Sequence, residues 1–83
     1  MKVTIKYFAS IREAIGQGDE VRVTQAATLS ALRDELLQAS PAHAQALARG
    51  KSVRLALNQV MSDESAVLKE DCEVAFFPPV TGG

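Results

Sequence analysis

The chain has 83 residues, which is enough for one small domain and leaves no room for a catalytic cleft between two lobes. Nine basic and ten acidic residues are interleaved and give a net charge of −1, which argues against nucleic-acid binding, because that requires a concentrated basic patch. One cysteine excludes an internal disulfide and suits a reducing compartment. Because neither a signal-peptide pattern nor a membrane-length apolar run is found, we expect a cytoplasmic protein with no membrane partner.

Alternating apolar residues predict a first strand over residues 2–8, with Phe8 as an aromatic ring on its otherwise polar face. Residues 9–15 predict a short helix, in which Ser10 and Glu13 have the spacing of a capping box. Gly16 is placed to end this helix. A second strand is predicted over residues 20–24, as a hairpin-like return with its two valines facing inward: Val21 and Val23.

The main helix is predicted to begin after Thr28, a good N-cap, and to end at Ser40-Pro41. Its apolar stripe would supply most of the core and consists of Leu29, Leu32, Leu36 and Ala39. Its charged residues are expected to face away from the core: Arg33, Asp34 and Glu35.

The second half of the chain predicts a short helix over residues 42–48 and three strands. The strands are expected at residues 52–57, 60–61 and 72–77, with a turn at Asn58-Gln59. In the last strand, Cys72 shares the buried face with Val74 and Phe76, whereas Phe77 lies on the opposite face.

This order of elements indicates an α+β fold, with a mixed sheet of about five strands, a main helix across one face and one or two short helices. The first and last strands are expected to be central, parallel neighbours, because the crossover between them contains the helix.

The stretch after the last strand has an unusual composition. Pro78 must end the sheet, because proline lacks an N–H donor. The six residues 78–83, if extended, would reach roughly 20 Å beyond the sheet. Gly82 and Gly83 carry no side chain, so a narrow channel would admit them. We therefore expect a domain over residues 1–77 and a tail over 78–83 that presents its carboxylate for reaction; an ordinary frayed terminus is the alternative.

Three motifs together resemble a known family: Tyr7-Phe8-Ala9 with Arg12-Glu13, Leu57-Asn58-Gln59, and the ending from Glu73 to Gly83. They are similar to the small, sulfur-carrying subunits of molybdopterin synthase, the MoaD-type carriers, which have a ubiquitin-like β-grasp fold. The resemblance spans nearly the whole chain. It departs at Asp71-Cys72, where family members usually have Gly-Asp; aspartate tolerates the left-handed conformation, so the turn is expected to survive.

The resemblance implies a carrier that is not an enzyme by itself. An E1-like enzyme would consume ATP to adenylate Gly83, and a sulfur-donating enzyme would complete its conversion to a thiocarboxylate. The tail, with Gly82 allowing it to thread, would enter the large subunit of molybdopterin synthase. There sulfur would pass to cyclic pyranopterin monophosphate for molybdenum cofactor biosynthesis, within a heterotetramer. The family binds no cofactor in the carrier subunit, and its catalytic side chains belong to the large subunit.

Apolar residues outside the predicted core suggest where such a partner docks. Phe8 and Phe77 lie, by alternation, on the face opposite their strands' core residues, and Met61 is a possible third member. The remaining partner contacts are expected along the tail, at Pro78, Pro79, Val80 and Thr81.

Conventional catalytic chemistry has weak support in the sequence. His43 is interpreted as a surface histidine without a second metal ligand at suitable spacing, and no metal site is expected. Cys72 is interpreted as a small buried hydrophobe. Three other functions remain open: a thiamine-type sulfur carrier, a ubiquitin-like protein modifier, and a β-grasp binding module with an inert tail.

Overall fold

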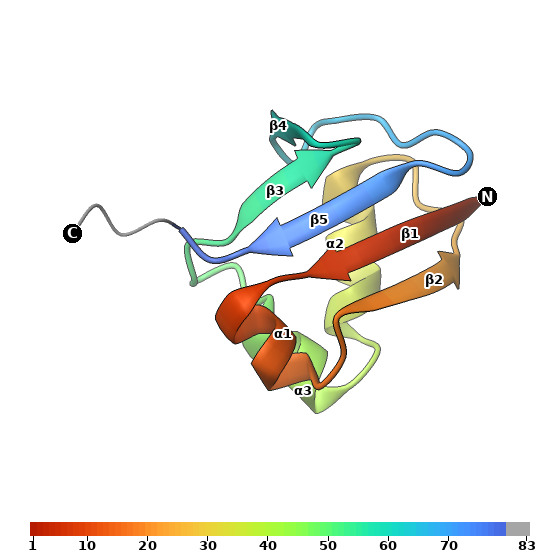
Figure 1. Cartoon of the computed structure of the whole chain (residues 1–83). Helices are drawn as coiled ribbons and strands as arrows, with labels where there is room; N and C mark the ends of the chain where they lie inside the picture. Colours follow the sequence, from red (N-terminus) through yellow and green to blue (C-terminus); the bar gives the residue numbers. More distant parts are fainter. Residues whose placement is uncertain (80–83) are drawn as a thin grey trace.

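The computed structural model describes residues 1–79, which form a five-stranded sheet and three helices (Figure 1). The strands are β1 (Lys2–Tyr7), β2 (Asp19–Val23), β3 (Arg54–Leu57), β4 (Val60–Ser62) and β5 (Glu73–Phe77). The helices are α1 (Ala9–Ile15), α2 (Leu29–Leu37) and α3 (Pro41–Ala46). Among these residues, no helix has the length and apolar character needed to cross a membrane.

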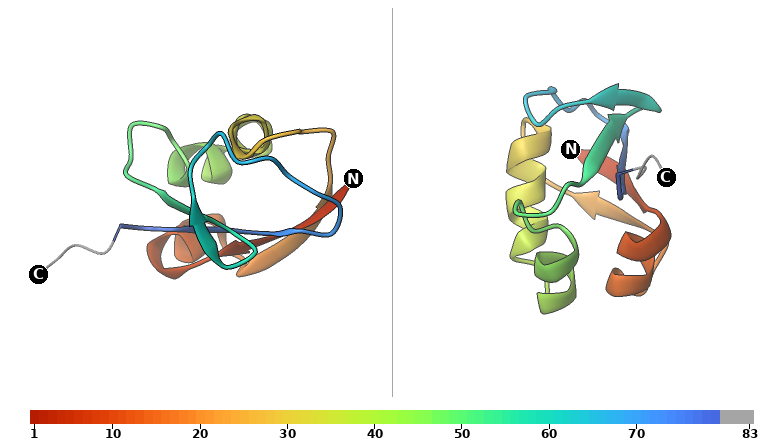
Figure 2. Two further views of the ribbon diagram at one scale, coloured as in Figure 1. Left: turned by 90° about the horizontal axis from the view of Figure 1, so that it is seen from above. Right: turned by 90° about the vertical axis from the view of Figure 1, so that its left-hand side faces the viewer.

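The strand order is β2-β1-β5-β3-β4, with β1 and β5 parallel and every other pair antiparallel. The parallel pair is central, as the sequence predicts, and α2 lies in the crossover between its strands. The views in Figure 2 show α2 and α3 on one side of the sheet. The mixed sheet covered by α2 confirms the predicted α+β β-grasp fold.

The core lies between α2 and the sheet. Leu29, Leu32 and Leu36 are fully buried, as predicted for the apolar stripe of the main helix. The helix ends at Leu37, earlier than predicted, and the fourth predicted member of the stripe, Ala39, is exposed. They pack in one cluster with the alternate residues of β1 and β5, which are Val3, Ile5, Tyr7, Val74 and Phe76. The helix begins as predicted, because the Thr28 side chain accepts a hydrogen bond from the amide of Ala31 at 3.2 Å.

The prediction that the valines of β2 face inward is wrong. Val21 is 63% exposed and Val23 is 78% exposed. The register pairs Ile5 with Glu20 and Val3 with Arg22, so the charged residues of β2 share the face that α2 covers. Their charges are compensated there, because Arg22 lies 3.1 Å from Glu35 and 3.6 Å from Glu20.

His43 is not the surface histidine that the sequence suggests. Its Nε2 lies 3.1 Å from the Glu20 carboxylate, and its Nδ1 lies 2.7 Å from the Ser40 hydroxyl. The Tyr7 hydroxyl donates to the same Glu20 oxygen at 2.6 Å. This half-buried cluster connects α3 to the first two strands, and alternation alone could not reveal it because its members come from distant segments.

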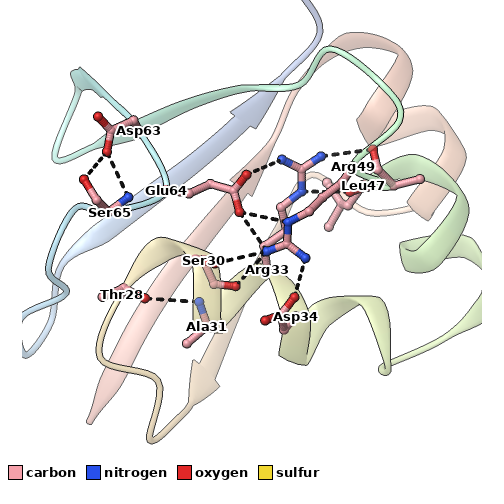
Figure 3. A network of polar contacts seen from close by, with 11 residues as sticks. Thr28, Ser30, Ala31, Arg33, Asp34, Leu47, Arg49, Asp63, Glu64 and Ser65 are labelled. Carbon is pink, nitrogen blue, oxygen red and sulfur yellow. Dashed lines mark hydrogen bonds and ion pairs between the residues drawn. The ribbon is translucent and has the colours of Figure 1, made fainter.

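Arg33 is also placed differently from its prediction, since it is buried rather than directed to solvent. Its guanidinium donates to the carbonyl oxygens of Leu47 and Ala48 at 2.8 and 3.0 Å, and it contacts Glu64 at 3.5 Å (Figure 3). A long aliphatic stem lets arginine cross apolar surface while its head finds acceptors, which a helical-wheel argument does not anticipate.

The predicted capping box at the start of α1 is absent. The N-cap is Phe8, whose side chain forms no capping bond, and Ser10 already lies inside the helix. Because Phe8 is the N-cap of α1, strand β1 ends at Tyr7, one residue earlier than predicted. Gly16 ends the helix in the left-handed conformation with φ of 91°, as expected.

Two turns have the geometry that the sequence predicts. Asn58 and Gln59 both have positive φ, at 49° and 69°, as a tight hairpin between β3 and β4 requires. Asp71 also adopts positive φ, at 61°, so the turn survives without the family's glycine. Cys72 follows this turn and is buried, as expected.

Candidate docking face and tail base

Strand β5 determines where the tail leaves the domain. It is hydrogen-bonded between β1 and β3 and ends at Phe77, after which Pro78 and Pro79 are half-buried. Proline lacks the donor that a ladder needs, so pairing stops there. The remaining predicted tail residues, Val80, Thr81, Gly82 and Gly83, lie outside the described residues.

Phe8 and Phe77 lie next to each other at the tail base, which is the point where β5 ends and Pro78 follows. Their ring centroids are 6.3 Å apart and their planes meet at 85°, an edge-to-face arrangement. The Phe8 amide donates to the carbonyl of Phe76 at 3.1 Å, which fixes the end of β1 against β5. Phe8 remains 45% exposed, so the pair forms a surface feature rather than part of the core.

Met61 lies on the same face of the sheet as this aromatic pair. It is 54% exposed and stands opposite Ala56 in the ladder, and Ala56 stands opposite Ala75 of β5. We call these five residues the outer cluster: Phe8, Ala56, Met61, Ala75 and Phe77. Ala56 and Ala75, each only 6% exposed, were not predicted as members, although a small side chain at an alternating position was the available signal.

Charged residues border the outer cluster. Arg54 stands opposite Phe77 in the ladder and is exposed. Lys6 stands opposite Ala75, and its ammonium group lies 3.7 Å from the Glu73 carboxylate. An apolar centre with a charged rim is the usual composition of a protein-binding surface.

A cavity of about 210 Å³ adjoins the tail base on its other side. Its lining includes Pro78 and Pro79, together with Ile11, Ala14, Ala46 and Val53. The first two tail residues therefore lie beside α1, α3 and the segment before β3.

The described residues form no conventional active site. Among them, no group of three or more potential metal ligands was found. Cys72 is only 3% exposed, and His43 is engaged by Glu20 and Ser40. This geometry places the last described residues at the end of a strand that is hydrogen-bonded on both sides, beside an apolar face on which Phe8 and Met61 are exposed.

The fold and this arrangement define a ubiquitin-like β-grasp protein whose central strand leads into its C-terminus. The ThiS family matches residues 5–83, and the chain belongs to this family.

Curated relatives match along the entire sequence. The chain is 38% identical over 81 residues to the molybdopterin synthase sulfur carrier subunit of Haemophilus influenzae, covering 98% of this chain and 99% of the relative. It is 37% identical over 81 residues to the subunit of the same name from Escherichia coli, with the same coverage.

Solved structures show the same fold. SAMP1 from Haloferax volcanii has a TM-score of 0.79 at 25% identity, with all of both chains covered. The complex of subunits 1 and 2 of the molybdopterin-converting factor from Helicobacter pylori contains a chain with a TM-score of 0.70 at 26% identity, again with both chains fully covered.

Proposed function

We propose that this chain is the sulfur carrier subunit of molybdopterin synthase. The observation that carries the proposal is structural: the central strand β5 runs directly into Pro78-Pro79, beside the outer cluster, in which Phe8 and Met61 are exposed. A carrier needs both features, a rigid domain that a partner can grip and a tail that projects from it. Whole-length similarity to two subunits named for this function supports the assignment.

The proposed chemistry takes place on the carboxylate of Gly83. A carboxylate is a poor electrophile, so an E1-like enzyme first transfers AMP from ATP to one of its oxygens and releases pyrophosphate. A sulfur-donating enzyme then delivers sulfur at the oxidation level of sulfide, which attacks the carbonyl carbon; AMP leaves with that oxygen, and a thiocarboxylate remains. ATP is thus bound and consumed by the activating partner rather than by this chain.

The proposed division of labour follows the two parts of the chain. Residues 1–77 dock through the outer cluster, whereas residues 78–83 enter the large subunit, where sulfur passes to cyclic pyranopterin monophosphate. Gly82 permits close passage through a narrow channel, and Pro78-Pro79 limit the conformations of the arm. Tethering raises the effective concentration of the sulfur reagent at the partner's active site. The two-subunit complex from Helicobacter pylori supports a large-subunit partner, and we propose a heterotetramer.

The decisive experiment is the intact mass of the full chain after incubation with ATP, an E1-like activating enzyme and a sulfur source. We expect one oxygen to be replaced by sulfur, with fragmentation placing the change on Gly83. An unchanged mass, with an activating enzyme that charges a known carrier in parallel, would contradict the proposal and favour a binding module with an inert tail.

The two alternative functions, a thiamine-type sulfur carrier and a protein modifier, are distinguished by experiments that follow the charging of Gly83. A thiamine-type carrier would also be charged, but it would fail to bind the large subunit of molybdopterin synthase. A protein modifier would become linked through Gly83 to lysines of other proteins, visible as heavier species in cell extract. SAMP1, whose name stands for small archaeal modifier protein 1, is a structural neighbour at 25% identity and gives this second possibility its basis. The higher identity to the sulfur carrier subunits favours the molybdopterin function.

A further inference from the structure

Strand β2 forms one edge of the sheet and its outward backbone groups have no partner strand among the described residues (Figure 1). Met1 and Thr24 exchange two backbone hydrogen bonds, at 2.8 and 3.1 Å, and the Tyr7 amide donates to the Gly18 carbonyl at 2.9 Å. Hydrogen-bonded pairs alternate along an antiparallel ladder. The backbone amides and carbonyls of Asp19, Val21 and Val23 therefore point away from β1.

Three side chains along this edge are exposed, the two apolar ones of Val21 and Val23 and the carboxylate of Asp19. Val21 and Val23 lie on the face opposite α2 and rank among the most exposed large hydrophobic residues of residues 1–79, at 63% and 78%. An unpaired edge of this length with exposed valines is a template for another strand. The opposite edge differs, because β4 has only three residues, from Val60 to Ser62.

The sequence of β2 is self-complementary in one antiparallel register. If two copies pair about Val21, Asp19 of each copy stands opposite Val23 of the other, and all outward amides and carbonyls can bond, about six hydrogen bonds in total. In the same register Glu20 faces Arg22 of the second copy. Opposite charges directly across strands stabilise pairing.

The neighbouring registers lack this complementarity. Centring the pair on Glu20 places two carboxylates opposite each other, and centring it on Arg22 places two guanidinium groups opposite each other. Like charges in directly opposed positions destabilise a sheet. Charge therefore selects both the occupant of this edge, a second copy of the chain, and its register.

We propose that β2 is a self-association edge, through which two copies pair antiparallel about Val21 to form one continuous sheet. The two-fold axis runs through the Val21 pair, perpendicular to the sheet. It places both outer clusters on the same face of the dimer. It separates the two β5 strands by about five strand spacings, roughly 24 Å, so both tails remain accessible. The inference does not depend on the proposed function.

The test is the molar mass of the full chain by sedimentation equilibrium, from about 10 μM to about 1 mM, a range suited to a weak, small interface. We expect the mass to rise toward that of a dimer. Val21→Lys should raise the dissociation constant at least about tenfold, because two ammonium groups would meet at the axis. Val60→Lys is the matched control on the other edge and should leave the dissociation constant unchanged.

Amide hydrogen exchange identifies the edge independently of mass. Asp19, Val21 and Val23 should exchange more slowly at about 1 mM than at about 10 μM, whereas Glu20 and Arg22, bonded to β1, should not change. A wild-type chain that remains monomeric across this range would overturn the proposal. So would a dimer that Val21→Lys leaves intact, provided that circular dichroism shows the variant to be folded.

Discussion

At the scale of single residues, Arg33 connects two loops to the main helix. Its guanidinium donates to Leu47 and Ala48 in the loop after α3 and contacts Glu64 before the last strand (Figure 3). Arg49 adds exposed contacts with Asp34 and Glu64. The buried contacts matter most, since an exposed ion pair contributes little to stability.

Arg33→Leu should lower the free energy of unfolding by about 1–3 kcal/mol, because the Leu47 carbonyl would lose its donor in a buried site. Urea denaturation measures this change. Arg12→Leu, at an exposed arginine, serves as the control and should change stability by less than about 0.5 kcal/mol. Equal effects from both substitutions would contradict the structural role of Arg33.

Glu20 is the second residue with an unusual environment. Burial opposes its ionisation, but hydrogen bonds from Tyr7 and His43 and the charge of Arg22 outweigh this and lower its pKa below the ordinary value of 4.5. Burial, together with the neighbouring Glu20 carboxylate, raises the pKa of Tyr7, so the phenol remains the donor in this pair.

A lowered pKa in the folded state predicts a defined pH dependence. Ionised Glu20 stabilises the fold above about pH 4.5, and this contribution disappears as the pH falls through the lower folded-state pKa. The stability difference between wild type and Glu20→Gln should therefore be largest near neutral pH and shrink on acidification. Urea midpoints at a series of pH values would show it. A difference that is constant with pH would contradict this account, and Glu13→Gln controls for loss of an exposed carboxylate.

At the scale of elements, β5 links the core to the proposed docking face. Its alternate residues Val74 and Phe76 are fully buried under α2, whereas Ala75 and Phe77 belong to the outer cluster. Because one strand supplies both faces and also leads to Pro78, the central strand β5 sets the position of the proposed docking surface relative to the tail.

Phe77→Asp should weaken binding to the large subunit of molybdopterin synthase by about 3 kcal/mol or more, roughly a hundredfold in Kd, because it would bury an unpaired charge. Isothermal titration calorimetry with the purified large subunit measures this. Val60→Asp introduces the same charge at an exposed site outside the outer cluster and should have little effect. Unchanged affinity for the Phe77 variant would show that the ring does not contribute to the interface.

At the scale of the whole molecule, we propose that the core provides stability and the tail provides the chemistry. The buried cluster is built from residues between Val3 and Phe76, and Pro78 follows the last strand directly. We therefore propose a stable domain over residues 1–77 whose stability does not require the final glycines.

Deletion of Gly83 should therefore leave the thermal midpoint of unfolding unchanged within about 1 °C, since a loss of 1 kcal/mol in a domain of this size shifts the midpoint by about 4–8 °C. The same deletion should abolish sulfur transfer, because the reactive carboxylate would be displaced by one residue. Calorimetry and the sulfur-transfer assay give the two readouts. A marked loss of stability would contradict the separation of domain and tail.

Much of the fold could be predicted because its signals are local. Alternation in β1 and β5, the leucine stripe of α2, the N-cap at Thr28 and the turn at Asn58-Gln59 each depend on neighbouring residues. Val21, Arg33 and His43 were misjudged for a common reason. Each prediction assumed that apolar side chains face inward and charged ones outward, but an edge strand or a long polar side chain can reverse this when distant partners supply compensating charges.

The sequence by itself determined the order of the elements, the apolar stripe and the point where the sheet must end, because hydrophobic periodicity and the missing donor of proline operate within a few residues. Only the tertiary structure decided which face of β2 is buried, that Ala56 and Ala75 lie on the same face as the Phe8–Phe77 pair, and that Arg33 is enclosed. Those features depend on strand register and on contacts between segments far apart in the chain, which no local pattern encodes.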